Sequence, residues 1–166
     1  MRRALVIDQA TQLTAYNIIE FDENAVNWLC CSKLRIRDGN STQRSCELYS
    51  RMSDLIDEYH ITDLVIEEVP LSRKMNLHVT EVLLKLLGMF EMLAVFKQID
   101  IHIMNVIKWK HDAGITSKTR NEQKAESVKL ALKRFPAYKD IVCQSDDVAD
   151  SLNMGIAFLK QIKILK

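Results

Sequence analysis

Four carboxylates in this chain stand where they can together hold metal ions. Asp8 and Glu67 each end a short apolar, strand-like run, whereas Asp147 and Asp150 lie three residues apart at the start of a C-terminal helical segment. An acid in an apolar strand is costly to bury unless its charge is compensated, and a divalent cation compensates it. We interpret the four acids as a Mg²⁺ or Mn²⁺ site assembled from distant parts of the chain.

The chemistry that such a site would serve is phosphodiester hydrolysis. Two divalent cations roughly 3.5–4 Å apart activate the attacking water and stabilise the leaving oxygen. We expect Asp8, on a rigid central strand, to bridge the two ions and Glu67, on a neighbouring strand, to hold one of them. The i,i+3 spacing of Asp147 and Asp150 puts both on one side of their helix, close to its positive N-terminus.

Each of these acids also has an ordinary structural interpretation. Asp8 can be a turn residue at the end of a strand, where Asp is common. By strand alternation one of Glu67 and Glu68 should be exposed, and we choose Glu67 as the ligand. The acids from 146 to 150 can form an acidic first turn capped by Ser145, and Asp146 is a further candidate for the site.

Composition predicts one ordinary domain. The chain has 166 residues, 48% of them hydrophobic, and only 4 Gly and 2 Pro, so residues 1–166 are expected to form a single core without linkers. No apolar stretch is long enough to span a membrane, and the apolar run at the N-terminus is too short for a signal segment. We therefore expect a cytoplasmic protein.

The cysteines and histidines do not predict a metal site. The four cysteines lack CxxC spacing and are interpreted as reduced thiols, mostly in the core. The four histidines show no ligand spacing and are interpreted as structural or solvent-facing. They are Cys30, Cys31, Cys46 and Cys143, and His60, His78, His102 and His111.

The net charge of +1 hides an uneven distribution. Between Lys108 and Arg134 there are eight basic residues and three acidic ones. Such a segment can form a basic surface for nucleic acid beside the acidic site, or simply a solvated helix face.

Hydrophobic periodicity predicts an α/β protein with a mixed five-stranded sheet covered by helices on both faces. Strands are expected at about 3–9, 14–21, 26–36, 63–68 and 100–104. Helices are expected around 48–59, at 76–97, near 106–110, at 122–135 and from about 145 onward.

The helix expected at 76–97 carries apolar residues on more than one face. A surface helix of a monomer has one apolar stripe, so this helix needs a second cover besides its own sheet. We expect that cover to be a partner subunit in a homodimer.

Three motifs give the chain a resemblance to a known family. Asp8-Gln-Ala-Thr-Gln-Leu-Thr-Ala-Tyr16 resembles the first motif of the RuvC-type Holliday junction resolvases. Ile66-Glu-Glu-Val69 resembles their second motif, and Asp147-Val-Ala-Asp-Ser-Leu152 their last. Lys108 and Lys124 resemble two basic positions that the family uses near the scissile phosphate. The similarity runs from about residue 3 to 160, with the motifs in the family's order.

The resemblance implies a ribonuclease H-like fold, a homodimer and two-metal cleavage of branched DNA. Asp8, Glu67, Asp147 and Asp150 carry over as ligands of two Mg²⁺ or Mn²⁺ ions per active site. Lys108 and Lys124 carry over as contacts to the phosphate or transition state. The wider set of expected DNA contacts adds Lys110, Lys118, Arg120, Arg73 and Lys74.

Departures from the family pattern leave the substrate range open. Gln9 and Ala10 replace the Pro-Gly that follows the first acid, and Pro70 stands where many members have a stacking aromatic residue, for which Leu71 or Met75 would have to substitute. The leading prediction is a dimeric, metal-dependent endonuclease that resolves four-way (Holliday) junctions and related branched DNA by paired nicks. The alternatives are a nuclease tolerant of forks and other branched DNA and a non-catalytic junction-binding protein. A more distant alternative is an actin-like phosphotransfer fold, but this chain lacks the glycines that the phosphate loops of that fold need. A bacterial and a phage origin fit equally well.

Overall fold

One five-stranded sheet organises the protein. The computed structural model describes residues 1–10, 12–70 and 76–165. The strands lie in the order β3-β2-β1-β4-β5, with β1 in the centre; β1, β2 and β3 are antiparallel, whereas β1, β4 and β5 run parallel. The strands are β1 (Arg2–Asp8), β2 (Leu13–Phe21), β3 (Val26–Arg35), β4 (Asp63–Glu67) and β5 (Asp100–Met104). The predicted mixed sheet is confirmed.

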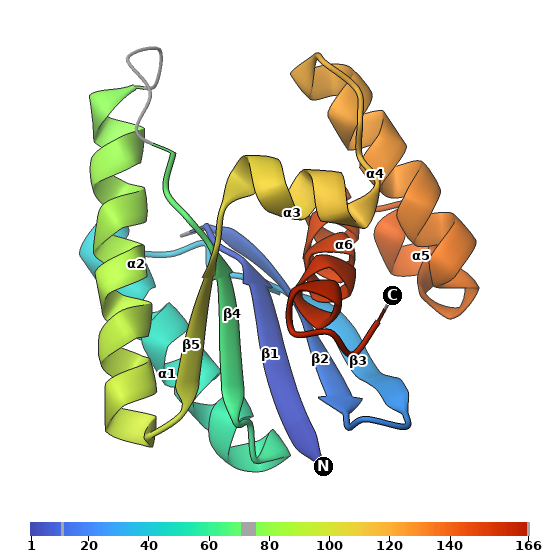
Figure 1. Cartoon of the computed structure of the whole chain (residues 1–166). Helices are drawn as coiled ribbons and strands as arrows, with labels where there is room; N and C mark the ends of the chain where they lie inside the picture. The colour runs from blue at the N-terminus through green and yellow to red at the C-terminus, as the bar shows by residue number, and fades with distance from the viewer. Residues whose placement is uncertain (11, 71–75, 166) are drawn as a thin grey trace.

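Helices cover both faces of this sheet (Figure 1). Helices α1 and α2 pack on one face, while α3 and α6 pack on the other, with α4 against α6. The helices are α1 (Ser41–Tyr59), α2 (Leu77–Lys97), α3 (Val106–Ala113), α4 (Arg120–Arg134), α5 (Lys139–Val142) and α6 (Asp146–Gln161), with a 3₁₀ turn at Pro136–Tyr138. The sequence did not predict that turn or α5.

The alternation of side chains along β1 and β4 places Asp8 and Glu67 on the same face of the sheet. Leu5 and Ile7 of β1 are buried under α1 and α2, whereas Ala4 and Val6 are buried under α3 and α6. Because successive side chains point to opposite faces, Asp8 lies on the same face as Ala4 and Val6. Glu67 follows Val65 in the same way in β4, and Ile7 pairs with Ile66 in the parallel register. Both carboxylates therefore lie on the face that α6 covers, at the carboxyl ends of two adjacent inner strands.

Local capping explains where two helices begin. Asn40 caps α1 in a reciprocal capping box with Gln43, and Thr119 does the same for α4 with Glu122. This second box starts α4 at Arg120, two residues before the predicted start. Ser145 occupies the N-cap position of α6 as predicted, but in the described chain its hydroxyl makes no capping hydrogen bond.

Helix α2 has a large uncovered apolar surface, and it lies along one outer side of the molecule (Figure 1). Leu86 and Phe90 are fully buried against the sheet and α1. In contrast, Leu77, Val95 and Phe96 are 86%, 75% and 66% exposed. The face that a partner was predicted to cover is thus open in the single chain. None of the helices in the described ranges is long and apolar enough to cross a membrane.

The cysteines are free, but they are not mostly in the core. Cys30 and Cys31 in β3 are partly buried, whereas Cys46 in α1 and Cys143 in the turn after α5 are exposed. The prediction of mostly buried thiols was wrong for the second pair, because Cys46 is on the exposed face of α1 and Cys143 is in the exposed turn after α5.

The contact between α6 and β2 depends on a glycine. A Cβ at Gly155 would lie 2.7 Å from Ile19 Cδ1 and 3.3 Å from Asn17 Oδ1. We predict that Gly155→Ala destabilises the protein by about 1–3 kcal/mol, the usual cost of overpacking a core. Thermal unfolding should show a lower Tm, by about 2–4 °C per kcal/mol.

A double-mutant cycle isolates this contact. In an Ile19→Val background the clashing Cδ1 is gone, so Gly155→Ala should cost clearly less there than in the wild type. Equal costs in both backgrounds would show that α6 does not approach β2 as described.

Candidate metal centre and DNA-facing cleft

A cleft of about 490 Å³ opens at the carboxyl ends of β1 and β4, between α3, α4 and α6. All four predicted acids line it, although they come from three distant segments of the chain: Asp8, Glu67, Asp147 and Asp150. Of the described residues, three cations line it as well, namely Lys110, Arg120 and Lys124. The structure therefore brings together the acids that the sequence predicted to converge.

Asp8 lies at the centre of this acidic group. Burial raises its pKa well above the usual range, and the neighbouring charges of Glu67, Asp150 and Asp147 raise it further. Lys124 opposes this effect only in part. A partly buried carboxylate with three others near it is destabilised when all are ionised, so the group favours a bound cation.

Glu67 is held by an aromatic donor. The indole Nε1 of Trp109, a buried residue of α3, donates a 2.8 Å hydrogen bond to Glu67 Oε1. Burial raises the pKa of Glu67, and the hydrogen bond from Trp109 partly offsets this. The next acid, Glu68, is exposed and accepts a 2.7 Å bond from Asn105 Nδ2. The choice of Glu67 over Glu68 therefore agrees with the geometry of the cleft.

The first turn of α6 contains two acids with opposite environments. Asp146 forms an ion pair with Lys124, and this contact lowers the pKa of Asp146. Asp147 lines the cleft, and burial followed by the charge of Asp146 raises its pKa. Asp146 is thus neutralised by a protein cation, whereas Asp147 is left facing the other acids.

Asp150 lies one turn further along α6. Burial raises its pKa, and a hydrogen bond from the Ser127 hydroxyl to Asp150 Oδ1 works in the opposite direction. The plain acidic-first-turn interpretation does not explain this residue, because Asp150 is turned toward the cleft and its other acids.

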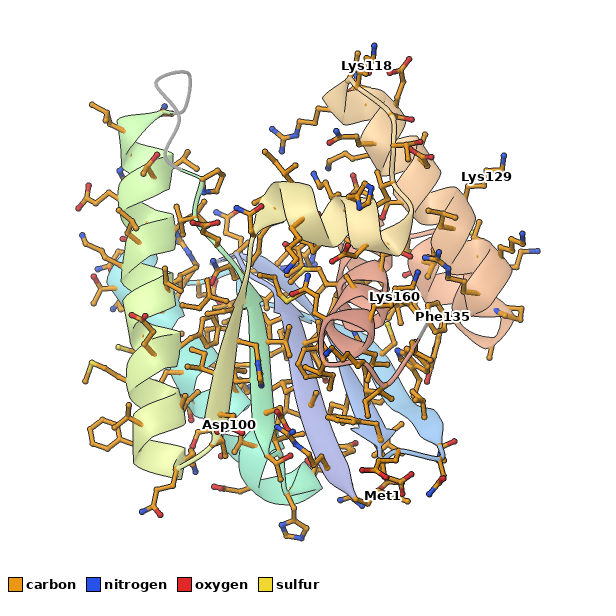
Figure 2. The ribbon with its side chains drawn as sticks, viewed as in Figure 1. Met1, Asp100, Lys118, Lys129, Phe135 and Lys160 are labelled. Carbon is orange, nitrogen blue, oxygen red and sulfur yellow. The ribbon has the colours of Figure 1, made fainter. Side chains whose placement is uncertain are left out.

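The basic residues divide into those in the cleft and those around it. Lys110 lines the cleft and donates a 3.2 Å bond to Gln123 Oε1, whereas Lys108, two residues earlier on α3, is exposed and outside the lining. Lys118 is exposed in the loop just before α4, at the outer end of that helix (Figure 2). Arg73 and Lys74 lie outside the described residues, as do Leu71 and Met75.

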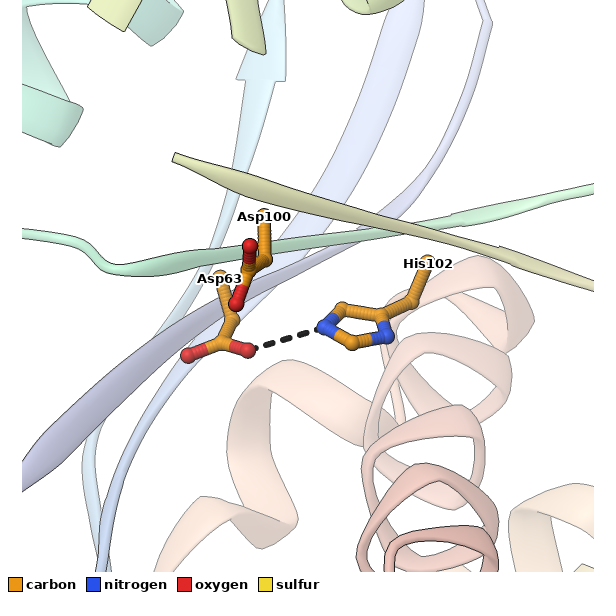
Figure 3. A group of neighbouring side chains, drawn as sticks. All are labelled: Asp63, Asp100 and His102. Carbon is orange, nitrogen blue, oxygen red and sulfur yellow. Dashed lines mark hydrogen bonds and ion pairs between the residues drawn. The ribbon is translucent and has the colours of Figure 1, made fainter. Parts of the chain in front are cut away.

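A second acidic group lies at the opposite end of β4 and β5 (Figure 3). Possible ligand atoms of Asp63, Asp100 and His102 lie within 4.8 Å of one another. The Asp63 carboxylate, however, pairs with Arg2 and accepts bonds from Thr62 Oγ1 at 2.7 Å and from His102 Nε2 at 2.8 Å. Burial raises the pKa of Asp63, but these bonds outweigh it and lower the pKa overall. Since its charge is already compensated, we interpret this group as a structural network.

The cleft acids fit a hard divalent cation better. Their donors are all carboxylate oxygens, which Mg²⁺ and Mn²⁺ prefer. All four acids have raised pKa values with burial as the main cause, and among the described residues no cation forms an ion pair with them. His102 belongs to the other end of the sheet, and the cleft contains no thiolate among its described lining residues.

Comparison with known proteins agrees with this geometry. The family model for crossover junction endodeoxyribonuclease RuvC matches residues 4–158. The chain belongs to the RuvC family. No curated protein sequence matches it.

Solved structures of Holliday junction resolvases have the same fold as this RuvC-family chain. A Thermus thermophilus RuvC structure in complex with a Holliday junction substrate is similar with a TM-score of 0.75 at 11% identity, covering 99% of this chain and 98% of that one. The fowlpox virus resolvase in a Holliday junction DNA complex gives 0.69 at 13%, covering 97% and 99%. The yeast mitochondrial Holliday junction resolvase gives 0.68 at 14%, covering 98% and 80%. The expected ribonuclease H-like fold is confirmed.

The pKa shifts of Asp8 and Asp146 predict opposite effects of these two acids on the stability of the fold. The folded pKa of Asp8 is raised, so its ionised form costs stability above that pKa, and the cost disappears below the unfolded pKa. In chelator at neutral pH, Asp8→Asn should therefore raise Tm, by about 2–4 °C for each kcal/mol relieved. The difference from wild type should shrink as the pH is lowered.

Asp146 supplies the matched control, because its folded pKa is lowered. Its charge stabilises the fold above the unfolded pKa, and that stabilisation is lost as the pH falls through the folded value. Asp146→Asn should thus leave Tm unchanged or lower it. A lower Tm for Asp8→Asn than for wild type in chelator would contradict the described charge cluster.

Proposed function

We propose that this RuvC-family protein resolves Holliday junctions and related branched DNA by paired nicking through two-metal phosphodiester hydrolysis. Asp8, Glu67, Asp147 and Asp150 would hold two Mg²⁺ or Mn²⁺ ions. The observation that carries the proposal is the convergence of these four acids from β1, β4 and α6 in one cleft. Family membership supports the reaction class, and the raised pKa values support cation binding.

The bound ions would supply an activated water and stabilise charge on the leaving oxygen. The chain's own residues do the positioning. Asp8 ends the central strand, which is hydrogen-bonded to a neighbouring strand on each side, and its carboxylate is close enough to the other three for their charges to raise its pKa. Trp109 holds Glu67 in a fixed orientation. These constraints keep the oxygens in place when no ion neutralises them.

The basic residues have two expected roles. Lys110, Arg120 and Lys124 line the cleft, so they would contact the phosphate that enters it. Lys108 and Lys118 are exposed outside the cleft lining and would contact more distant phosphates, which gives affinity without sequence preference. Lys124 would have to exchange part of its pairing with Asp146 for the phosphate. Arg73 and Lys74 remain predicted DNA contacts.

Paired nicking requires two active sites. The uncovered apolar side of α2, at about residues 76–97, supports a homodimer through this helix. A two-fold axis between the copies would place two identical clefts against symmetric strands of a four-way junction. The structures of RuvC and of the fowlpox virus resolvase with junction DNA support that substrate.

The whole of residues 1–166 would act as one nuclease unit, and the family match over residues 4–158 supports this. A DNA substrate also favours action in the cytoplasm, either of a bacterial cell or of the host if the protein is phage-encoded.

A second candidate function is cleavage of forks and other branched DNA with little selectivity for four-way junctions. Pro70, Val79 and Leu83 form an apolar wall of the cleft. Pro70 offers no aromatic face on which an unpaired base can stack. Binding of a junction with an open centre is therefore stabilised less here than it would be by an aromatic residue at this position.

Removing a metal ligand should abolish cleavage. We predict that Asp8→Asn lowers the cleavage rate in Mg²⁺ or Mn²⁺ by at least about 100-fold, because metal-ion stabilisation is worth several kcal/mol and each 1.4 kcal/mol is about a factor of ten. Binding of junction DNA should persist. Glu68→Gln is the control: this acid is exposed outside the cleft, and cleavage should stay within about two-fold of wild type.

The measurement is single-turnover cleavage of a labelled four-way junction, with binding followed by gel shift in Ca²⁺. Full cleavage by Asp8→Asn would refute the metal-site assignment. Tight, salt-sensitive binding by the wild type with no cleavage in either metal would instead identify a non-catalytic junction-binding protein.

Substrate comparison separates the two enzyme functions. With four-way junction, fork and linear duplex under equal conditions, a strict resolvase cleaves the junction far faster than the fork. We expect junction and fork to be cut within about ten-fold of each other, because a lost stacking contact is worth about 1–3 kcal/mol. Replacing Pro70 by Phe should raise the preference for the junction. No change in preference would exclude a stacking role at this position.

A further inference from the structure

A continuous chain of hydrogen-bond donors ends on one of the cleft acids. Arg134 Nη1 donates to Asn153 Oδ1 at 2.9 Å. Asn153 Nδ2 donates to Ser127 Oγ at 3.0 Å and to the Ser127 carbonyl at 2.9 Å. Ser127 Oγ then donates to Asp150 Oδ1. The chain connects α4 and α6 through their packed interface.

The direction of this chain is determined by its first member. The guanidinium of Arg134 only donates, so the amide oxygen of Asn153 must face it and the amide nitrogen must face Ser127. Since Ser127 Oγ accepts from that nitrogen, its own proton is left for Asp150. A carboxylate only accepts when ionised, so every bond in the chain is satisfied in one orientation alone.

The chain is shielded from water. Ser127 and Asn153 are fully buried. Arg134 also donates from Nη2 to the carbonyl of Ala113 at 2.7 Å, which ties it to the end of α3. Because buried hydrogen bonds do not exchange with solvent partners, their geometry is held more rigidly than on a surface.

We propose that Ser127 is a positioning residue for the metal centre: its hydroxyl, oriented by Asn153 and Arg134, holds Asp150 toward the other cleft acids. The inference rests on the proposed function and deepens it. None of these three residues lines the cleft, so each acts through Asp150 and not on the substrate.

The need for such a residue follows from charge. The like charges of Asp8 and Asp150 raise each other's energy, and Asp150 sits on a helix, where its side chain has other rotamers available. Without a donor behind it, the carboxylate would turn away from Asp8 when no ion is bound. The Ser127 hydroxyl stabilises the inward orientation and so prepares the site for the cation.

The test compares two buried serines. Ser127→Ala removes the donor but leaves Asn153 Nδ2 bonded to the backbone carbonyl of residue 127, so the fold should be kept. Ser151→Ala is the matched control: Ser151 is also fully buried, but its hydroxyl donates to the Val148 carbonyl within α6. Mg²⁺ is titrated against the junction cleavage rate and, separately, against Tm without DNA.

For Ser127→Ala we expect the half-saturating Mg²⁺ concentration to rise about 10–100-fold in both titrations, the usual effect of removing a residue that orients a metal ligand. The rate at saturating Mg²⁺ should approach that of wild type. Ser151→Ala should keep the wild-type half-saturation. Arg134→Lys, which preserves the charge but cannot bridge both acceptors, should shift it in the same direction as Ser127→Ala.

The outcomes separate the inference from the proposed function. If wild type cleaves and binds Mg²⁺, and Ser127→Ala and Arg134→Lys both have wild-type half-saturation, the positioning role is overturned and the proposed function stands. A lowered Tm for Ser127→Ala with unchanged half-saturation likewise shows a merely structural residue. If wild type neither cleaves nor gains Tm with Mg²⁺, the proposed function fails and the inference fails with it.

Discussion

Like-charge repulsion among partly buried carboxylates is the constraint on which the rest of this structure depends. Asp8, Glu67 and Asp150 are held close together in a place where burial alone raises the pKa of each. A protein that needed only stability would separate or neutralise these acids, as it does at the other end of the sheet, where Arg2 and His102 compensate Asp63. The contrast between the two ends of β4 indicates that the ionised cleft acids destabilise the protein and that a bound divalent cation removes this destabilisation.

Strand pairing, side-chain alternation and individual hydrogen bonds hold these acids in place. The parallel pairing of β1 and β4 sets the two strand ends side by side, and alternation turns both acids toward α6. A buried indole holds Glu67, and a buried hydroxyl holds Asp150. Both donors belong to helices, α3 and α4, that also carry the basic residues of the cleft. The same helices therefore position the ligands and present the cations that would meet the DNA, so a shift of either helix would disturb both.

Much of this could be predicted from the sequence because it depends on local patterns. Apolar runs with an acid at the end predicted β1 and β4, and the spacing of Asp147 and Asp150 predicted one face of α6. Other features depend on contacts that no local pattern records. The donors Trp109 and Ser127 carry no signal of their own, since a buried indole or hydroxyl is common in any core. Counting basic residues between Lys108 and Arg134 also overstated the exposed charge, because Arg134 is turned inward to Asn153. The exposed Cys46 and Cys143 were missed for the same reason, as burial is decided by tertiary packing.

The most direct test of the metal-centre assignment is a count of bound ions. Mn²⁺ binding to the wild-type protein without DNA, measured by titration calorimetry and by electron paramagnetic resonance, should give two ions per chain with magnetic coupling between them. The same measurement on Asp8→Asn should lose that coupled pair, while Asp63→Asn should keep it. A wild-type protein that binds no Mn²⁺, or that loses its ions with Asp63→Asn and not with Asp8→Asn, would contradict the assignment of the cleft as the metal centre.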